Sequence, residues 1–165
     1  MDKKGHVLNA LLLAIGVGYV LEPSGDVETF VAIAEVSLPL VLGALFPDVD
    51  TAFGKHRKTL HNLPILGIAL AYPYFFGNLS FVWAGILSHY VLDMLGSKRG
   101  IALFYPFWSE EFGSPTGVTT TSKFADVVTI VVTLIEIAVF AVFVHLLPQY
   151  LPPGLELGGM TAIGL

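Results

Sequence analysis

The sequence predicts an all-α, polytopic membrane protein with about five transmembrane helices, and three observations support this fold class. Of the 165 residues, 55% are hydrophobic and only 13% are charged, whereas a soluble domain averages about 25% charged residues. The mean hydropathy is +0.77. Five stretches lack Lys and Arg over lengths that approach the roughly 20 residues of a membrane span. Lipid is therefore the expected solvent, and disorder, a coiled coil and an ordinary soluble enzyme are excluded.

The expected spans follow one another along the chain. The first begins after Lys3 and Lys4; a signal peptide is the alternative, but no A-x-A cleavage sequence follows the apolar run. The third is short and contains Pro73, so we expect a kink there or a different boundary with the fourth. We expect one domain over residues 1–147 and a tail rich in Pro and Gly over 148–165. The expected spans are residues 5–21, 30–46, 63–76, 79–95 and 125–147.

All basic residues fall on one side of this predicted topology. With five spans, residues 1–4, 47–62 and 96–124 share one face of the membrane. Short cytoplasmic loops carry an excess of Lys and Arg, so we expect this face and the N-terminus to be cytoplasmic. The expected localisation is the cytoplasmic membrane of the cell, with several passes. The basic residues are Lys3, Lys4, Lys55, Arg57, Lys58, Lys98, Arg99 and Lys123.

An imidazole and a carboxylate lie four residues apart in the fourth expected span. On a helix, His89 and Asp93 project about 40° apart from one face, where both side chains can reach one ion. A hydrogen bond between helices is the alternative for an isolated pair with this spacing. Ionisable residues are costly inside a bilayer, which makes them functional candidates.

Two further polar pairs follow the second expected span. We expect Pro47 to end that helix, so that Asp48 and Asp50 lie in a turn where both carboxylates can converge on a cation. A solvated turn is the alternative. His56 and His61 are five residues apart and would not share one face of a regular helix. We therefore expect one of them to bind the ion and the other to assist.

The predicted topology brings these groups to one membrane surface. Three or four nitrogen and oxygen ligands with one open position are typical of catalytic zinc. The chain contains no cysteine, so zinc is the expected divalent ion, while manganese, magnesium and iron also suit these residue types. The expected metal ligands are His6, Asp48, His61, His89 and Asp93.

Three neighbouring residues are candidates for catalysis. We expect Asp50 to orient a ligand, to bind a second ion or to act as a general base. His56 is expected to add a ligand or to protonate the leaving group. Arg57 is expected to bind a phosphate, with membrane orientation as the alternative reason for its charge.

Other polar features stay outside this predicted site. Glu35 and Glu136 lie in spans that contain no basic residue, so we expect them to be protonated or hydrogen-bonded to groups such as Asn9. A proton or ion pathway is the alternative. The aromatic segment 101–113 is too short to cross the membrane. We expect it to lie at headgroup depth, as an anchor or as one wall of a cleft.

Taken in order, these motifs resemble the YdjM-like family of small membrane-bound proteins described as metal-dependent hydrolases. The resemblance covers roughly residues 1–110, and it implies a hydrolase while leaving the substrate open. One departure is that many relatives read T-H-S around the second loop histidine, where this chain reads Leu60, His61 and Asn62. The matching residues are His6, Pro47, Asp48, Asp50, His56, Arg57, His61, His89, Asp93 and Pro106.

The leading hypothesis is an integral membrane hydrolase that cleaves a phosphoester of a lipid or lipid-linked substrate at the cytoplasmic face. One alternative is a non-catalytic membrane protein with a structural metal or ion-transport site, and another is a small subunit of a membrane complex. Membrane lipid and a lipid phosphate are the expected partners, with a homo-oligomer as a further option. Nucleic acid is excluded because the net charge is -5 and the basic residues form no long stripe.

Overall fold

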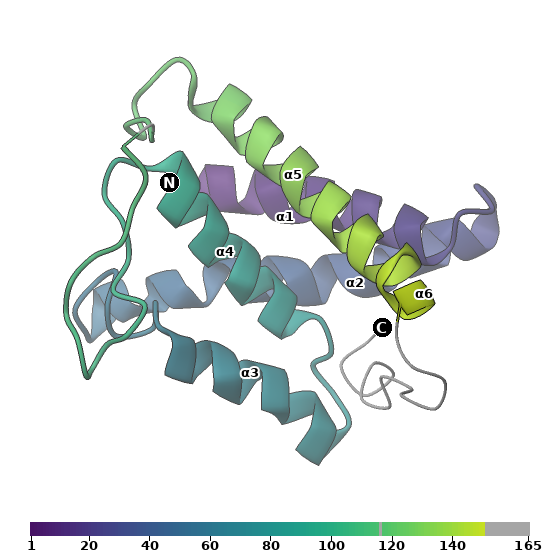
Figure 1. Ribbon diagram of the computed structural model, residues 1–165, viewed down its shortest axis with the longest axis horizontal. Helices are drawn as coiled ribbons and strands as arrows, with labels where there is room; N and C mark the ends of the chain where they lie inside the picture. Colours follow the sequence, from purple (N-terminus) through teal and green to yellow (C-terminus); the bar gives the residue numbers. More distant parts are fainter. Residues whose placement is uncertain (116, 151–165) are drawn as a thin grey trace.

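The computed structural model describes residues 1–115 and 117–150 and shows a helical protein (Figure 1). Within these residues the only β-structure consists of two isolated bridges, Ser97 with Val118 and Ile101 with Phe112. The all-α fold class is therefore confirmed. The helices are α1 (Lys3–Leu21), α2 (Val27–Leu45), the 3-10 helix η1 (Pro47–Ala52), α3 (Leu63–Phe76), α4 (Val82–Gly96), α5 (Ala125–His145) and the single turn α6 (Leu147–Tyr150).

Three helical segments are long and apolar enough to cross a membrane: α1, α2 continued through η1, and α5. By contrast, α3 and α4 have 14 and 15 residues. At 1.5 Å per residue they measure about 21 and 22 Å, which is less than the roughly 30 Å of a hydrocarbon core. The structure thus contains a helix for each of the five expected spans, and three of these helices have the length of a complete span.

The fourth helix starts later than the sequence predicts. It begins at Val82 rather than at residue 79, because Leu79 and Phe81 adopt positive φ angles of 59° and 68°, which are incompatible with a right-handed helix. Pro73 lies inside α3, and that helix ends at Gly77, whose left-handed conformation is typical of a helix C-terminus.

Side-chain caps fix the starts of three helices. Asp2 accepts a hydrogen bond from Gly5 N at 2.8 Å and begins α1, and Asp26 begins α2 in the same way. Asn62 begins α3 by accepting from Ile65 N at 3.1 Å. Because Asn62 directly follows His61, this last cap also fixes the direction in which the chain leaves that histidine.

A close crossing of α2 and α4 forms the centre of the fold. A Cβ atom on Gly43 would lie 2.1 Å from the Val82 carbonyl oxygen, and one on Gly85 would lie 2.2 Å from the Leu40 oxygen. Small residues that let helix backbones touch are typical of membrane helix packing. Beside this crossing, α1 and α2 share a buried apolar cluster of Ala10, Leu13, Ala14, Val17, Val36, Leu40 and Ala44.

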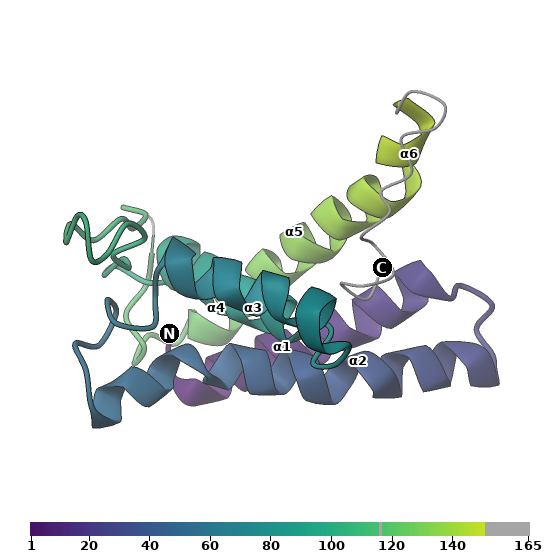
Figure 2. The same ribbon diagram turned by 90° about the horizontal axis from the view of Figure 1, so that it is seen from below.

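Helix α5 contacts the other helices only along its first half. Its buried residues are Thr129, Val132 and Thr133, and Figure 2 shows the helix rising away from the others towards α6. The remaining length exposes apolar side chains, which suits lipid as the solvent. They include Leu134, Ile135, Val139, Val142 and Phe143.

One end of the molecule collects the polar segments. The N-terminus, η1 and the connection after α4 lie together there, opposite the α1–α2 connection (Figures 1 and 2). Pro47 ends α2 as expected, but the residues after it form a 3-10 helix instead of an open turn. Proline is tolerated in a first helical turn because it needs no N–H partner there, and backbone bonds such as Val49 N to the Phe46 oxygen close the turns.

The connection between α4 and α5 is irregular and carries the aromatic segment. The rings of Phe104, Trp108 and Phe112 pack on one another, while Phe107 is 90% exposed. Arg99 pairs with Glu111 through two hydrogen bonds of 2.8 and 2.9 Å, and these hold the pKa of the Glu111 carboxyl below its usual range. The segment is anchored to its own loop by these contacts. Of the expected tail, residues 151–165 lie outside the described residues.

Candidate metal centre

Four side chains from three parts of the chain surround one point at the polar end. The Nε2 atoms of His61 and His89 are 3.0 Å apart, and Asp48 Oδ1 lies 3.8 Å from each of them. Asp93 Oδ2 lies 3.7 Å from His89 Nε2 and 4.0 Å from His61 Nε2. A tetrahedral zinc site with bonds of about 2.0–2.1 Å has ligand atoms about 3.3–3.4 Å apart, so these four atoms have nearly the spacing of such a site.

The hydrogen bonds of the two imidazoles fix which nitrogen faces this point. His61 Nδ1 lies 3.0 Å from Asp50 Oδ2, and His89 Nδ1 lies 2.6 Å from the Ala44 carbonyl oxygen. A carboxylate and a carbonyl oxygen can only accept, so each Nδ1 carries the proton. Both Nε2 atoms therefore present lone pairs to one another at 3.0 Å. A cation between them removes this repulsion, and metal-binding histidines are commonly oriented in this way.

Burial keeps this group dry. His61, His89 and Asp50 are fully buried, and Asp93 is 1% exposed. Desolvation lowers the pKa of His61, although Asp50 and Asp93 oppose this shift. The lowered pKa favours the neutral imidazole, which is the form that binds a metal.

Asp50 bridges two histidines from underneath the site. Its Oδ2 faces His61 Nδ1, and its Oδ1 lies 3.0 Å from His56 Nδ1. Leu60 N also donates to Oδ2 at 3.3 Å. Since both carboxylate oxygens contact histidines, the geometry corresponds to the first of the expected roles, which is to orient side chains.

His56 occupies the open rim of the site. Its side chain is 40% exposed, and its Nδ1 lies 3.9 Å from Asp48 Oδ1 as well as next to Asp50. The two loop histidines thus differ in environment, as the sequence predicts: His61 is enclosed with the ligand atoms, while His56 faces outward.

Arg57 fastens the connection after α4 to the site. Its Nη1 donates to Ser97 Oγ and the Gly100 oxygen at 3.2 Å, and it contacts the Arg99 oxygen. The same nitrogen lies 3.9 Å from Asp93 Oδ2. Arg57 is 9% exposed, so its charge lies inside the site, and its role towards a phosphate stays a prediction.

His6 brings the first helix to the same group. Its ring stacks on the ring of His89 with centroids 3.7 Å apart and planes at 12°. Its Nε2 lies 3.4 Å from Asp93 Oδ1, an oxygen that the Met1 amino group also contacts. Among the described residues, neither ring nitrogen of His6 has a hydrogen-bond partner. The structure therefore brings all five expected ligands and all three candidate catalytic residues to one end of the fold.

Comparison with known proteins assigns the family. The model of the YdjM inner membrane protein family matches residues 1–151, which include every candidate residue. The chain belongs to the YdjM inner membrane protein family. No curated protein and no solved structure shows significant similarity to it. The family description and the long apolar helices together give this YdjM family member a membrane location.

Sequence reasoning missed one residue of the YdjM site. The hydroxyl of Tyr90 donates to the Leu60 oxygen at 2.5 Å and accepts from Asn62 N at 3.1 Å, so it holds the backbone on both sides of His61. Tyr90 is 1% exposed. The available signal was a tyrosine beside His89 in an apolar helix, where a hydroxyl needs a partner.

Replacing Tyr90 by Phe should loosen this loop in the YdjM protein. The substitution leaves the Leu60 oxygen and the Asn62 N–H without their partner, and we expect the free energy of unfolding to fall by about 1–3 kcal/mol. Thermal unfolding in detergent measures the change. Tyr74→Phe is the matched control, since Tyr74 is 71% exposed. Equal stability of the two variants would contradict the positioning role of Tyr90.

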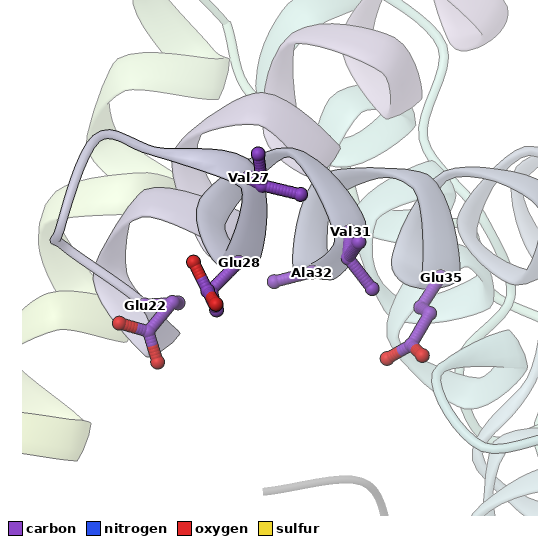
Figure 3. Close-up of a pocket in the computed structure, with 6 residues that line it drawn as sticks. All are labelled: Glu22, Val27, Glu28, Val31, Ala32 and Glu35. Atoms are coloured by element: carbon purple, nitrogen blue, oxygen red, sulfur yellow. The ribbon is translucent and has the colours of Figure 1, made fainter.

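The two intramembrane glutamates of this YdjM family member differ in environment. Asn9 Nδ2 donates to Glu136 Oε2 at 2.8 Å, and Ser88 Oγ donates to it at 3.2 Å, which confirms the expected hydrogen bonding. Glu35 is exposed instead, and it lines a shallow pocket on the first half of α2 (Figure 3). Figure 3 also shows Glu22 and Glu28 on this pocket, at the end of α2 away from the histidines.

Proposed function

We propose that this YdjM family member is a membrane hydrolase that depends on a divalent metal ion. The observation that carries the proposal is the pair of Nε2 atoms of His61 and His89, 3.0 Å apart with both Nδ1 protons directed elsewhere. Asp48 and Asp93 supply the carboxylate oxygens that complete a set of four. Two neutral nitrogens and two carboxylates suit zinc first, and manganese, magnesium or iron next.

The donor set passes a test of fit for such an ion. All four ligand atoms lie within a range of separations, 3.0–4.0 Å, that includes the edges of a zinc tetrahedron. A bound divalent ion supplies Lewis-acid polarisation and activates water near neutral pH. Two carboxylates would also balance the charge of the ion in a site that excludes water.

The chain's own residues have separable tasks in hydrolysis. Asp50 holds the rings of His61 and His56 in place through its two oxygens. His56 is the exposed titratable group at the rim, so it is placed to give a proton to a leaving group or to take one from water. Arg57 adds a buried positive charge beside Asp93, and this charge favours an anionic substrate.

A phosphoester of a lipid or lipid-linked molecule is the proposed substrate. The site lies at the end of the helices where the polar segments gather, beside an exposed aromatic loop (Figure 1). Lys55 and Lys98 are exposed at this end, and positive charge attracts phosphate. The confinement of basic residues to these segments supports a cytoplasmic orientation of the site in the cell membrane.

The first experiment combines metal analysis with turnover. Detergent-purified protein should contain stoichiometric zinc or manganese by elemental analysis, and the metal-loaded protein should hydrolyse bis(4-nitrophenyl) phosphate, a phospholipid or a lipid phosphate. Chelation should remove the activity, and the same metal should restore it. Full metal content without turnover of any phosphoester would favour a structural or transport site, and absence of metal after reconstitution would overturn the proposal.

His56→Ala separates catalysis from metal binding. Because His56 lies at the rim rather than among the four ligand atoms, the variant should keep its metal content while kcat falls by about 10²–10⁴-fold. Elemental analysis and initial rates measure the two effects on one preparation. His145→Ala, an exposed histidine at the end of α5, is the matched control. Loss of the metal together with the activity would make His56 a ligand instead.

A further inference from the structure

His6 is the buried group that the proposed four-ligand site leaves without a task. It is fully buried, and neither of its ring nitrogens has a hydrogen-bond partner among the described residues. Leaving a buried polar group without a partner costs about 1–3 kcal/mol. Nearby, its Nε2 points towards a carboxylate oxygen of Asp93 at 3.4 Å. This arrangement is that of a ligand atom with an ion between it and the oxygen.

Ring stacking prevents His6 from sharing the ion of His89. The lone pair of an imidazole nitrogen lies in the plane of its ring, and a metal binds at about 2.0–2.1 Å in that plane. The two rings are 3.7 Å apart and within 12° of parallel, so their lone pairs run side by side without meeting. An ion in the plane of His89 is therefore too far from the plane of His6 to be bound by both.

Asp93 connects these two parallel planes. Its Oδ2 lies 3.7 Å from His89 Nε2, and its Oδ1 lies 3.4 Å from His6 Nε2. Each carboxylate oxygen thus faces a different histidine. The Met1 amino group also contacts Oδ1, so this oxygen already lies beside a positive charge.

We propose that His6 and Asp93 Oδ1 hold a second divalent cation, so that Asp93 bridges a two-metal centre. This inference rests on the proposed function, because Asp93 Oδ2 belongs to the first ion. Two-metal hydrolytic sites have ions about 3.5–4 Å apart, and the ring spacing of 3.7 Å is of this size. Such pairs stabilise the attacking and leaving oxygens of phosphoryl transfer, which makes a phosphoester the substrate class of this site.

Manganese stoichiometry and electron paramagnetic resonance test the second ion directly. Full-length protein, tagged at its C-terminus, should bind about two Mn²⁺ per chain and give the broadened signal of a coupled pair. His6→Ala should bind about one Mn²⁺ per chain and give the resolved signal of an isolated ion. His145→Ala should behave like the wild type. His6→Gln, which keeps a polar side chain, replaces His6→Ala if the alanine variant does not fold.

The outcomes distinguish this inference from the proposed function. A single uncoupled Mn²⁺ in the wild type, unchanged in His6→Ala, would mean that the Met1 amino group is the only cation at Oδ1. That result overturns the second site and leaves the first ion and the hydrolase proposal standing. Absence of Mn²⁺ and of zinc from the wild type overturns both proposals. The wild-type stoichiometry alone decides the question, even if no variant folds.

Discussion

Asp93→Asn should abolish metal binding and turnover while the helices remain folded. The substitution replaces a carboxylate that faces His89 through one oxygen and His6 through the other with a neutral amide of the same shape. Loss of the ion removes several kcal/mol of transition-state stabilisation, which corresponds to a rate at least about 10³-fold lower. Elemental analysis and initial rates with a phosphoester substrate measure both effects.

The matched control for this variant is Asp126→Asn, which makes the same chemical change at an exposed position in the first turn of α5. It should keep the metal content and the rate of the wild type. The helical circular dichroism of both variants should equal that of the wild type. Unchanged activity in Asp93→Asn would contradict the assignment of Asp93 as a ligand, whatever the metal content.

Helical spacing explains why much of this site could be predicted from the sequence. A difference of four residues places His89 and Asp93 on one face of any regular helix, and the structure has them on α4. The distribution of Lys and Arg gave the grouping of helix ends, which placed His6, Asp48 and His61 together before any coordinates were considered. Both rules depend on residue type and position alone.

The orientation of the ligands could not be predicted in this way. His89 is fixed by the Ala44 carbonyl oxygen and His61 by the carboxylate of Asp50. A backbone carbonyl is present at every residue, so the sequence does not indicate which one faces a side chain. Arg57 illustrates the same limit, because its charge suggested a phosphate while its bonds run to carbonyls of the connection after α4.

The close crossing of α2 and α4 is the part of the fold on which this orientation depends. Gly85 lies one helical turn before His89, and Ala44, whose oxygen accepts from His89 Nδ1, is the next residue after Gly43. The two helices must touch backbone to backbone for this hydrogen bond to form. A side chain at the crossing would therefore move His89 relative to Asp48, which follows α2.

Gly85→Ala should destabilise the protein and weaken metal binding together. A Cβ atom at this position would lie 2.2 Å from the Leu40 oxygen and 2.8 Å from Ala44 N, and backbone atoms cannot rotate away as a flexible side chain can. The helices must separate, and we expect the free energy of unfolding to fall by about 1–3 kcal/mol. The metal affinity should fall as well, because His89 loses its orienting partner.

Gly67→Ala is a control of the same type in a different environment. A Cβ atom on Gly67 of α3 would have no neighbour within 4 Å, and alanine favours a helix over glycine by about 1 kcal/mol. Thermal unfolding in detergent and metal titration should therefore show equal or higher stability and unchanged affinity for Gly67→Ala. If Gly85→Ala lost stability but kept the wild-type metal affinity, the α2–α4 crossing would stabilise the fold without positioning the site.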